Sequence, residues 1–346
     1  MRVRGLGRVR RSALWLRNRL APGTLILRYH RVTDLPCDPY EQAVTPSHFA
    51  EHLEVLRKEC CPLPLQDLLQ AVQQGRVPRR AVAVTLDDGY ADNLHNAKPL
   101  LERYAIPATV FVATGNLGTR REFWWDELER LLLHPGSLPP TLCLKARGRR
   151  YQWDLGASAD FGAEDWHGYR RWRMFATEET PGPRPRLMRD LHALLRALPD
   201  AAQQEILQQV RDWAGVDATG RETHRALTPA ELIRLADGGL VEIGGHTVTH
   251  PALPALLAQA QRDEIQQGKA RLEEILGCPV VSFAYPQGDY GPETIAAVRE
   301  AGFRCACTTC AEAVRRPCDP YLLPRVWPRD WDGDTFARHI RNWFHQ

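Results

Sequence analysis

Apolar runs of strand length recur along this chain, and segments with helical spacing separate them. Seven runs predict buried strands, at residues 24–32, 81–86, 108–114, 241–244, 280–285, 305–309 and 321–327. Strands that alternate with helices pair in parallel and bring their carboxyl ends to one rim. The pattern therefore predicts an α/β fold, a parallel sheet or a barrel, with its site on that rim.

Helix signals lie between most of these runs. Ser47 is the expected N-cap of a helix that continues to Leu56, and residues 228–231 form a capping box that opens another helix. Further helices are expected at residues 65–72, 94–104, 254–276 and 293–301, and from residue 335 onward.

The alternation breaks between residues 117 and 222, which we interpret as a mainly helical insertion that covers the rim. A helix is expected at 123–133 and a hairpin at 142–155. The basic and aromatic cluster at 166–173 has two interpretations: it stacks on a sugar or holds a phosphate, or it is an exposed helix face with packed tryptophans. The predicted organisation is a basic arm at 1–22 and one domain at 23–346 that carries this insertion.

Composition narrows the class of protein. The 346 residues are 44% hydrophobic and 25% charged, which excludes a disordered or fibrous chain. A net charge of +3 gives no reason to expect nucleic acid as a partner. Nine cysteines are an odd number in a long chain, so we expect reduced thiols and a cytoplasmic protein rather than a disulfide framework. A metal site among the cysteines at 305–318 is a weak alternative.

The charge is uneven only at the N-terminus. The first twenty residues hold seven arginines and no acid, and their apolar residues form no run long enough for a signal peptide or a membrane span. A solvated arm is one interpretation. The other is a basic amphipathic helix on an anionic membrane, which would place the protein at the inner face of the cell membrane.

Candidate chemistry lies where the predicted strands end. Asp87 and Asp88 follow the run at 81–86, and two carboxylates side by side call for a cation or a shared proton. His246 and His250 follow the run at 241–244, and two imidazoles with one carboxylate are a common ligand set for a catalytic divalent metal. The alternative is a solvated turn beside an unrelated histidine pair.

Three motifs together resemble the polysaccharide deacetylase family, also called NodB homology or carbohydrate esterase family 4. TLDDGY resembles its TFDDG motif, HTVTHP its H-[ST]-x-x-H motif and FAYPQG its FRPPYG or FAYPYG motif, in the family's order. The resemblance runs from about residue 81 to the C-terminus. It implies a distorted (β/α)7 barrel, with residues 23–346 as a NodB-like domain, and metal-dependent removal of N-acetyl groups from amino sugars.

Position by position, the resemblance assigns roles to the motif residues. Asp88, His246 and His250 match the metal ligands, and Asp87 matches the catalytic base. Gln287 matches the position whose backbone N–H stabilises the oxyanion, although the family usually has tyrosine there. Zinc is the expected ion, with cobalt, nickel or iron as alternatives.

Two family features are missing from their usual places. The L-H-D motif that supplies the general acid is absent, but LRYH resembles the Y-H motif of apparently permuted exopolysaccharide deacetylases, so His30 is the expected acid. The arginine that steadies the base is replaced by Val281, and Arg325 is the candidate substitute.

The remaining candidate residues concern substrate binding. Tyr285 is expected at the substrate side of the site. Trp327 and Trp331 either line the acetyl pocket or belong to the core.

We therefore expect a metal-dependent N-deacetylase that hydrolyses the acetamide of an amino sugar in a polysaccharide, an oligosaccharide or a lipid-linked sugar. Three alternatives remain at this point. The first is a deformylase or deacylase of a lipid-linked amino sugar, and the second a sugar-binding module on the same barrel. The third, a non-haem iron oxygenase, lacks its usual H-x-[DE] pair.

Overall fold

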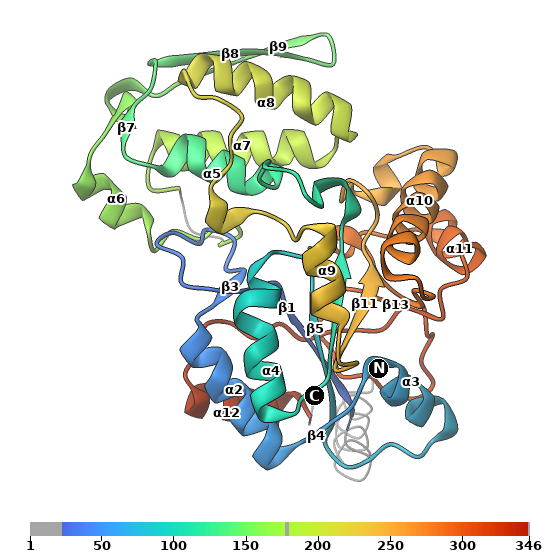
Figure 1. Ribbon diagram of the computed structural model, residues 1–346. Helices are drawn as coiled ribbons and strands as arrows, with labels where there is room; N and C mark the ends of the chain where they lie inside the picture. The colour runs from blue at the N-terminus through green and yellow to red at the C-terminus, as the bar shows by residue number, and fades with distance from the viewer. Residues whose placement is uncertain (1–22, 177–179, 345–346) are drawn as a thin grey trace, which may run out of the picture.

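A computed structural model describes residues 23–176 and 180–344. Six largely buried strands lie side by side in parallel (Figure 1). Their order is β1 (Leu25–Tyr29), β5 (Ala81–Leu86), β6 (Ala108–Val112), β11 (Val241–Gly245), β12 (Ser282–Ala284) and β13 (Cys305–Cys307). The short β4 (Cys61–Pro62) pairs with the start of β5.

The predicted strand at 321–327 does not form a regular strand, and the reason is its proline content. Pro324 has no N–H for a ladder, and only isolated bridges remain, from Leu323 to Cys307 and from Val326 to Leu27. This segment nevertheless runs between β13 and β1 and occupies the seventh position. The sheet thereby curls into a distorted (β/α)7 barrel, so the predicted fold is confirmed.

The predicted strand at 24–32 is also interrupted. β1 ends at Tyr29, and after His30 the chain forms β2 (Arg31–Val32), which pairs with β3 (Ala43–Val44) in a separate two-stranded sheet. His30 therefore lies at the end of a barrel strand rather than within one.

Amphipathic helices cover the outside of the barrel and bury their apolar faces against it. They are α2 (Pro46–Glu59), α3 (Leu65–Gln74), α4 (Lys98–Tyr104) after the π-helical η1 (Asn93–Ala97), α9 (Pro229–Ala236), α10 (Ala258–Leu276), α11 (Pro292–Glu300) and α12 (Gly333–Trp343). None of the helices in the described residues has the length and hydropathy of a membrane span.

Helix starts differ from the sequence prediction in two places. The N-cap of α2 is Thr45 rather than Ser47, because the Thr45 hydroxyl accepts a hydrogen bond from the His48 N–H. α10 begins at Ala258, since Leu253–Ala255 forms a separate 3-10 turn. The predicted capping box of α9 is present.

The chain between β6 and α9 builds a second layer over the end of the barrel, drawn in green and yellow in Figure 1. It contains α5 (Trp124–Leu133), α6 (Ala163–Tyr169), α7 (Pro183–Arg196), α8 (Asp200–Ala214), the hairpin β8 (Thr141–Ala146) and β9 (Arg149–Asp154), and the pair β7 (Gly136–Ser137) and β10 (Asp160–Phe161). This layer has its own apolar core between α5, α7 and α8. The boundaries 117–222 stay a prediction, and the basic arm at 1–22 lies outside the described residues.

Candidate active site

A cavity of about 350 Å³ opens where the barrel meets the second layer. All but one of the residues expected at the site line it: His30, Asp87, Asp88, His246, His250, Tyr285, Gln287 and Trp327. The exception, Arg325, is buried and bonded to Asp87. Residues that are far apart in the sequence thus meet at the carboxyl ends of the strands.

The backbone after β5 brings two neighbouring carboxylates to one rim. Asp88 has φ +75° and Gly89 has φ +81°, so the chain turns sharply directly after Asp87. A Cβ on Gly89 would lie 2.9 Å from Val112 Cγ1, which is too close for any other residue. The Asp87 N–H donates to the Tyr29 carbonyl at 3.0 Å and fixes the start of the turn.

Arg325 holds Asp87 through a bidentate ion pair. Its Nη1 donates to Oδ1 at 2.7 Å and its Nη2 to Oδ2 at 2.8 Å, while its Nε donates to the Thr308 carbonyl at 2.9 Å. Burial alone would raise the pKa of Asp87, but the Arg325 cation outweighs it and holds that pKa well below its usual range. Asp87 is therefore ionised at neutral pH and can accept a proton.

Asp88, His246 and His250 form a group that can hold a metal ion. One ligand atom from each lies within 4.8 Å of the others, and both Nε2 atoms are 3.4 Å from Asp88 Oδ1. The Nδ1 of His246 lies 2.8 Å from the Ala284 carbonyl, to which it donates, so its Nε2 is left as an acceptor. Asp88 Oδ2 is buried without a hydrogen-bond partner. A carboxylate and two imidazoles in this arrangement fit a divalent cation.

The loop that carries the histidines is strained and held in place. Thr247 and His250 have φ +68° and +57°. Glu264 of α10 accepts hydrogen bonds from the N–H groups of Val248 and Thr249 at 2.9 and 2.8 Å. Burial lowers the pKa of His250 to about 4, which keeps its imidazole neutral as metal binding requires.

His30 faces the same cavity from the end of β1. Its ring lies 5.4 Å from that of Trp327, and its Nδ1 is buried without a partner. Burial lowers the pKa of His30 to about 4. Of the two candidate tryptophans, Trp327 lines the cavity. Trp331 does not, because it stacks on His339 with ring centroids 3.9 Å apart.

Gln287 and Tyr285 come from the turn after β12. Gln287 has φ +59°, and its Oε1 accepts a hydrogen bond from Arg196 of the second layer. Its Nε2 is buried without a partner. Tyr285 donates its hydroxyl hydrogen to the Tyr321 carbonyl at 3.0 Å, so its ring rather than its hydroxyl is what the cavity receives.

The second layer contributes residues that sequence reasoning missed. The ring of Trp125 lies 4.8 Å from that of His250, and its indole N–H donates to the Tyr90 hydroxyl at 2.9 Å. Phe175 and His192 also line the cavity. The aromatic start of α5 was the only sequence signal for these contacts. Arg28 was missed as well, although a charge inside a run that reads as buried is itself a signal.

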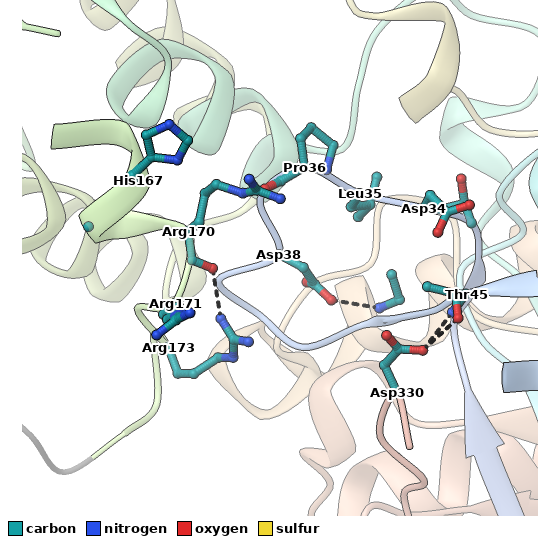
Figure 2. A pocket seen from close by; sticks show the side chains of 13 residues that line it. Asp34, Leu35, Pro36, Asp38, Thr45, His167, Arg170, Arg171, Arg173 and Asp330 are labelled. Atoms are coloured by element: carbon teal, nitrogen blue, oxygen red, sulfur yellow. Dashed lines mark hydrogen bonds between the residues drawn. The ribbon is translucent and has the colours of Figure 1, made fainter. Parts of the chain in front are cut away.

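A second, larger cavity of about 630 Å³ lies between the loop after β2 and the end of α6 (Figure 2). Arg170, Arg171 and Arg173 line it, but Arg170 Nε donates to the Pro36 carbonyl and Arg173 Nη1 to the Arg170 carbonyl. Among the aspartates that line the cavity, Asp38 accepts hydrogen bonds from two backbone N–H groups, at 3.0 and 2.8 Å. Trp172 is buried, and Trp166 is half-buried with its ring 5.4 Å from that of His134, so both tryptophans of this cluster pack within the protein.

The cysteines at 305–318 form no group that could hold a metal ion. Within residues 23–176 and 180–344 the Asp88, His246 and His250 group is the one in which three ligand side chains meet. Cys305 and Cys307 are buried on β13, and no cysteine of the described part is in a disulfide. The weak alternative of a cysteine metal site is therefore wrong for the described residues.

Known proteins resemble parts of this chain in sequence. A family model described as polysaccharide deacetylase matches residues 74–135 and 204–306. A putative polysaccharide deacetylase YxkH of Bacillus subtilis (strain 168) is 23% identical over 129 residues, 37% of this chain and 45% of that protein. A poly-beta-1,6-N-acetyl-D-glucosamine N-deacetylase of Staphylococcus aureus (strain MSSA476) is 34% identical over 77 residues, 22% of this chain and 27% of that protein. The matches thus span less than half of either curated relative.

Solved structures show a similar fold. The Streptococcus pyogenes deacetylase PplD, in complex with acetate, has a TM-score of 0.56 at 16% identity, over 92% of this chain and 99% of that one. IcaB from Ammonifex degensii has a TM-score of 0.56 at 20% identity, over 94% and 98%. At these identities the likeness concerns the fold alone.

Proposed function

This chain belongs to the polysaccharide deacetylase family, and from that premise we propose that it is a metal-dependent carbohydrate N-deacetylase. It would hydrolyse the acetamide of an N-acetylated amino sugar to an amine and acetate. The observation that carries the proposal is an ionised carboxylate, Asp87, held by Arg325 directly beside the three side chains that can bind a metal.

Asp88, His246 and His250 would hold the cation, and zinc is the first candidate, with cobalt, nickel and iron as alternatives. A divalent cation there would supply a Lewis acid that polarises the acetamide carbonyl and activates the hydrolytic water. The neutral imidazole of His250, the free Nε2 of His246 and the buried Asp88 carboxylate suit this role.

The other residues of the cavity would move protons and position the sugar. Asp87 takes a proton from the attacking water, and Arg325 keeps it ionised and oriented. The oxyanion accepts a hydrogen bond from the backbone N–H of Gln287. Burial favours neutral His30, whereas the Asp88 and Asp87 carboxylates favour its protonated form, so His30 would take up a proton before the step. It would then give that proton to the sugar nitrogen as the C–N bond breaks, so that the amine and acetate leave. Tyr285 and Trp327 provide aromatic walls for the substrate.

The substrate named for the S. aureus relatives, poly-beta-1,6-N-acetyl-D-glucosamine, is a first candidate here. A lipid-linked sugar at the inner face of the cell membrane is the other, and it matches the expected cytoplasmic location and the basic arm. Both the location and the membrane contact are part of the proposal.

The test measures acetate and formate released from N-acetylglucosamine oligomers and from a lipid-linked N-acetylhexosamine. We expect acetate from at least one substrate, loss of release with a chelator, and recovery on adding back a divalent metal. Asp87→Asn is the matched variant, because it should retain bound metal yet release no acetate. Formate in place of acetate would make the protein a deformylase, and metal binding without either product would leave a sugar-binding module.

A further inference from the structure

Arg28 places a buried cation in the wall of the candidate active site. It lies on β1, and alternate residues of a strand share a face, so Arg28 and His30 point to the same side. Its side chain is nine-tenths buried, with 9% of the residue exposed, and it lines the cavity together with Asp87 and Asp88. The backbone N–H of Arg28 donates to Val326 at 2.9 Å, which fixes the start of the side chain.

No acidic side chain of the described residues forms an ion pair or a hydrogen bond with this guanidinium, although Asp87 and Asp88 lie near it. Asp87 is bonded to Arg325 at both oxygens, and Asp88 faces the two histidines of the metal-binding group. Arg28 Nε is buried without a hydrogen-bond partner. The guanidinium lies over the ring of Trp327, with Cζ 4.4 Å from the centroid; the ring attracts a cation but accepts no hydrogen bond in the guanidinium plane.

An arginine in this state is costly for the protein to keep. Burial and the nearby Arg325 cation lower the pKa of Arg28 to about 9, so it still carries its charge at neutral pH. Asp87 and Asp88 offset part of this charge from a distance, but a buried cation without an ion-pair partner still destabilises a fold. In natural proteins such unsatisfied groups concentrate where a ligand completes them.

We propose that Arg28 binds an anionic group of the sugar substrate, a carboxylate or a phosphate, close to the acetamide that is hydrolysed. This inference rests on the proposed deacetylase function and names the class of its substrate. The planar guanidinium presents parallel N–H groups that match the two oxygens of either anion.

The shared contact with Trp327 sets where the anion lies. The Arg28 guanidinium lies 4.4 Å and the His30 ring 5.4 Å from the same Trp327 ring, so an anion bound to Arg28 lies within about one or two hexose rings of the proton donor His30. The anion therefore belongs to the same sugar as the acetamide, or to the sugar linked directly to it. A sugar 1-phosphate or lipid-linked phosphate fits this position, and so does a sugar that carries a carboxyl group.

The test compares three substrates that share the acetamido sugar. They are methyl N-acetylglucosaminide, which is neutral, N-acetylglucosamine 1-phosphate and N-acetylmuramic acid. We expect kcat/KM to be at least about tenfold higher for one of the anionic substrates than for the neutral one. Which one is preferred identifies the source of the anion. Arg28→Met should bring this ratio close to one, and Arg28→Lys should retain part of it.

Arg171→Met is the matched control. It removes one positive charge from the second cavity and leaves the barrel intact, so the ratio should persist. An equal loss of ratio in Arg171→Met would assign the preference to overall charge or to that cavity. An equal fall of kcat/KM for all three substrates in Arg28→Met would make Arg28 a general electrostatic residue. Either result overturns the inference, as does a wild-type preference for the neutral sugar.

A second measurement separates this inference from the proposed function. N-acetylglucosamine 1-phosphate or N-acetylmuramic acid should raise the melting temperature of the wild type but not of Arg28→Met, whether or not acetate is released. If the shift depends on Arg28 and no substrate is hydrolysed, the deacetylase proposal fails and the anion site stands. If the neutral sugar is hydrolysed, but no anionic sugar raises the melting temperature or has a higher kcat/KM, the anion site is wrong and the deacetylase proposal stands.

Discussion

The guanidinium of Arg325 meets the carboxylate of Asp87 in two parallel hydrogen bonds, across 238 positions of sequence. Both side chains are buried, and Thr85 and Thr308 accept the remaining hydrogen bonds of Arg325. Both the position and the charge of the proposed base, Asp87, therefore depend on Arg325, which lies in the segment that closes the barrel.

Replacing Arg325 should therefore impair the base in a way that pH reveals. In Arg325→Met the pKa of Asp87 rises, because burial then acts without the compensating cation. A base must be ionised, so the acidic limb of the kcat/KM profile should move to higher pH, with activity at pH 7 lower by about 100-fold.

The pH profile of acetate release checks this, with Arg325→Lys as the variant that restores part of the effect. Urea unfolding of Arg325→Met should show a loss of about 3–5 kcal/mol, since one charge of a buried pair remains. An unmoved acidic limb would mean that Asp87 is not the titrating base.

His30 is the expected proton donor to the leaving amine, and the choice of leaving group tests that role. His30→Gln should lower kcat/KM on an N-acetylated sugar by about 100-fold or more. An aryl acetate ester expels a phenolate that needs no proton, so its hydrolysis should fall by less than about fivefold. Equal losses on both substrates would contradict the role. His95→Gln is the control, because His95 is half exposed, pairs with Glu231 and lies outside the cavity.

The residues that sequence alone could locate are those in contiguous motifs at strand ends. Asp87 and Asp88 follow one largely buried strand, and His246 follows another, so the rim they share comes directly from the alternation of strands and helices. Arg325 could be suggested only as a substitute for a missing arginine. Its role depends on where the segment at 321–327 lies, and Pro324 keeps that segment from forming the strand that its apolar residues predict.

Contacts from the second layer could not be predicted. Trp125 and Phe175 reach the cavity because α5, α7 and their connections pack on one another. No local pattern in the sequence predicts how the apolar core of this second layer packs against the barrel. The split of the first predicted strand at His30 had a similar cause, since the pairing of β2 with β3 is decided by tertiary contacts.

Asp126 on α5 should make stability depend on pH. It accepts a hydrogen bond from the Tyr90 hydroxyl at 2.7 Å, and burial raises its pKa to about 7 despite the nearby Arg31. The unfolded value is about 4, so the stability contributed by the protonated carboxyl is complete below pH 4 and is lost as pH rises through 7.

Asp126→Asn keeps the shape and an acceptor for Tyr90 but does not titrate. Relative to the wild type, its free energy of unfolding in urea should therefore rise by about 2 kcal/mol between pH 5 and pH 8. Other buried groups that titrate are present in both proteins and cancel in the difference. Parallel curves for the two proteins would show that Asp126 is ionised in the fold.

Phe175 should bind the part of a sugar chain that extends beyond the reacting unit. Its side chain is 66% exposed although it lines the cavity, with its ring 6.2 Å from that of Tyr40 and 5.6 Å from that of His192. An aromatic ring held open at a cavity mouth offers a stacking surface of about 1 kcal/mol. Phe175→Ser should thus raise KM about fivefold for tetrasaccharides, with kcat unchanged because no reacting atom touches the ring. The melting temperature should stay the same, since little burial is lost.

Leu257→Ser is the control, because Leu257 is 84% exposed and lies outside the cavity. An unchanged KM for tetrasaccharides, or the same increase for a monosaccharide, would rule out an extended subsite at Phe175.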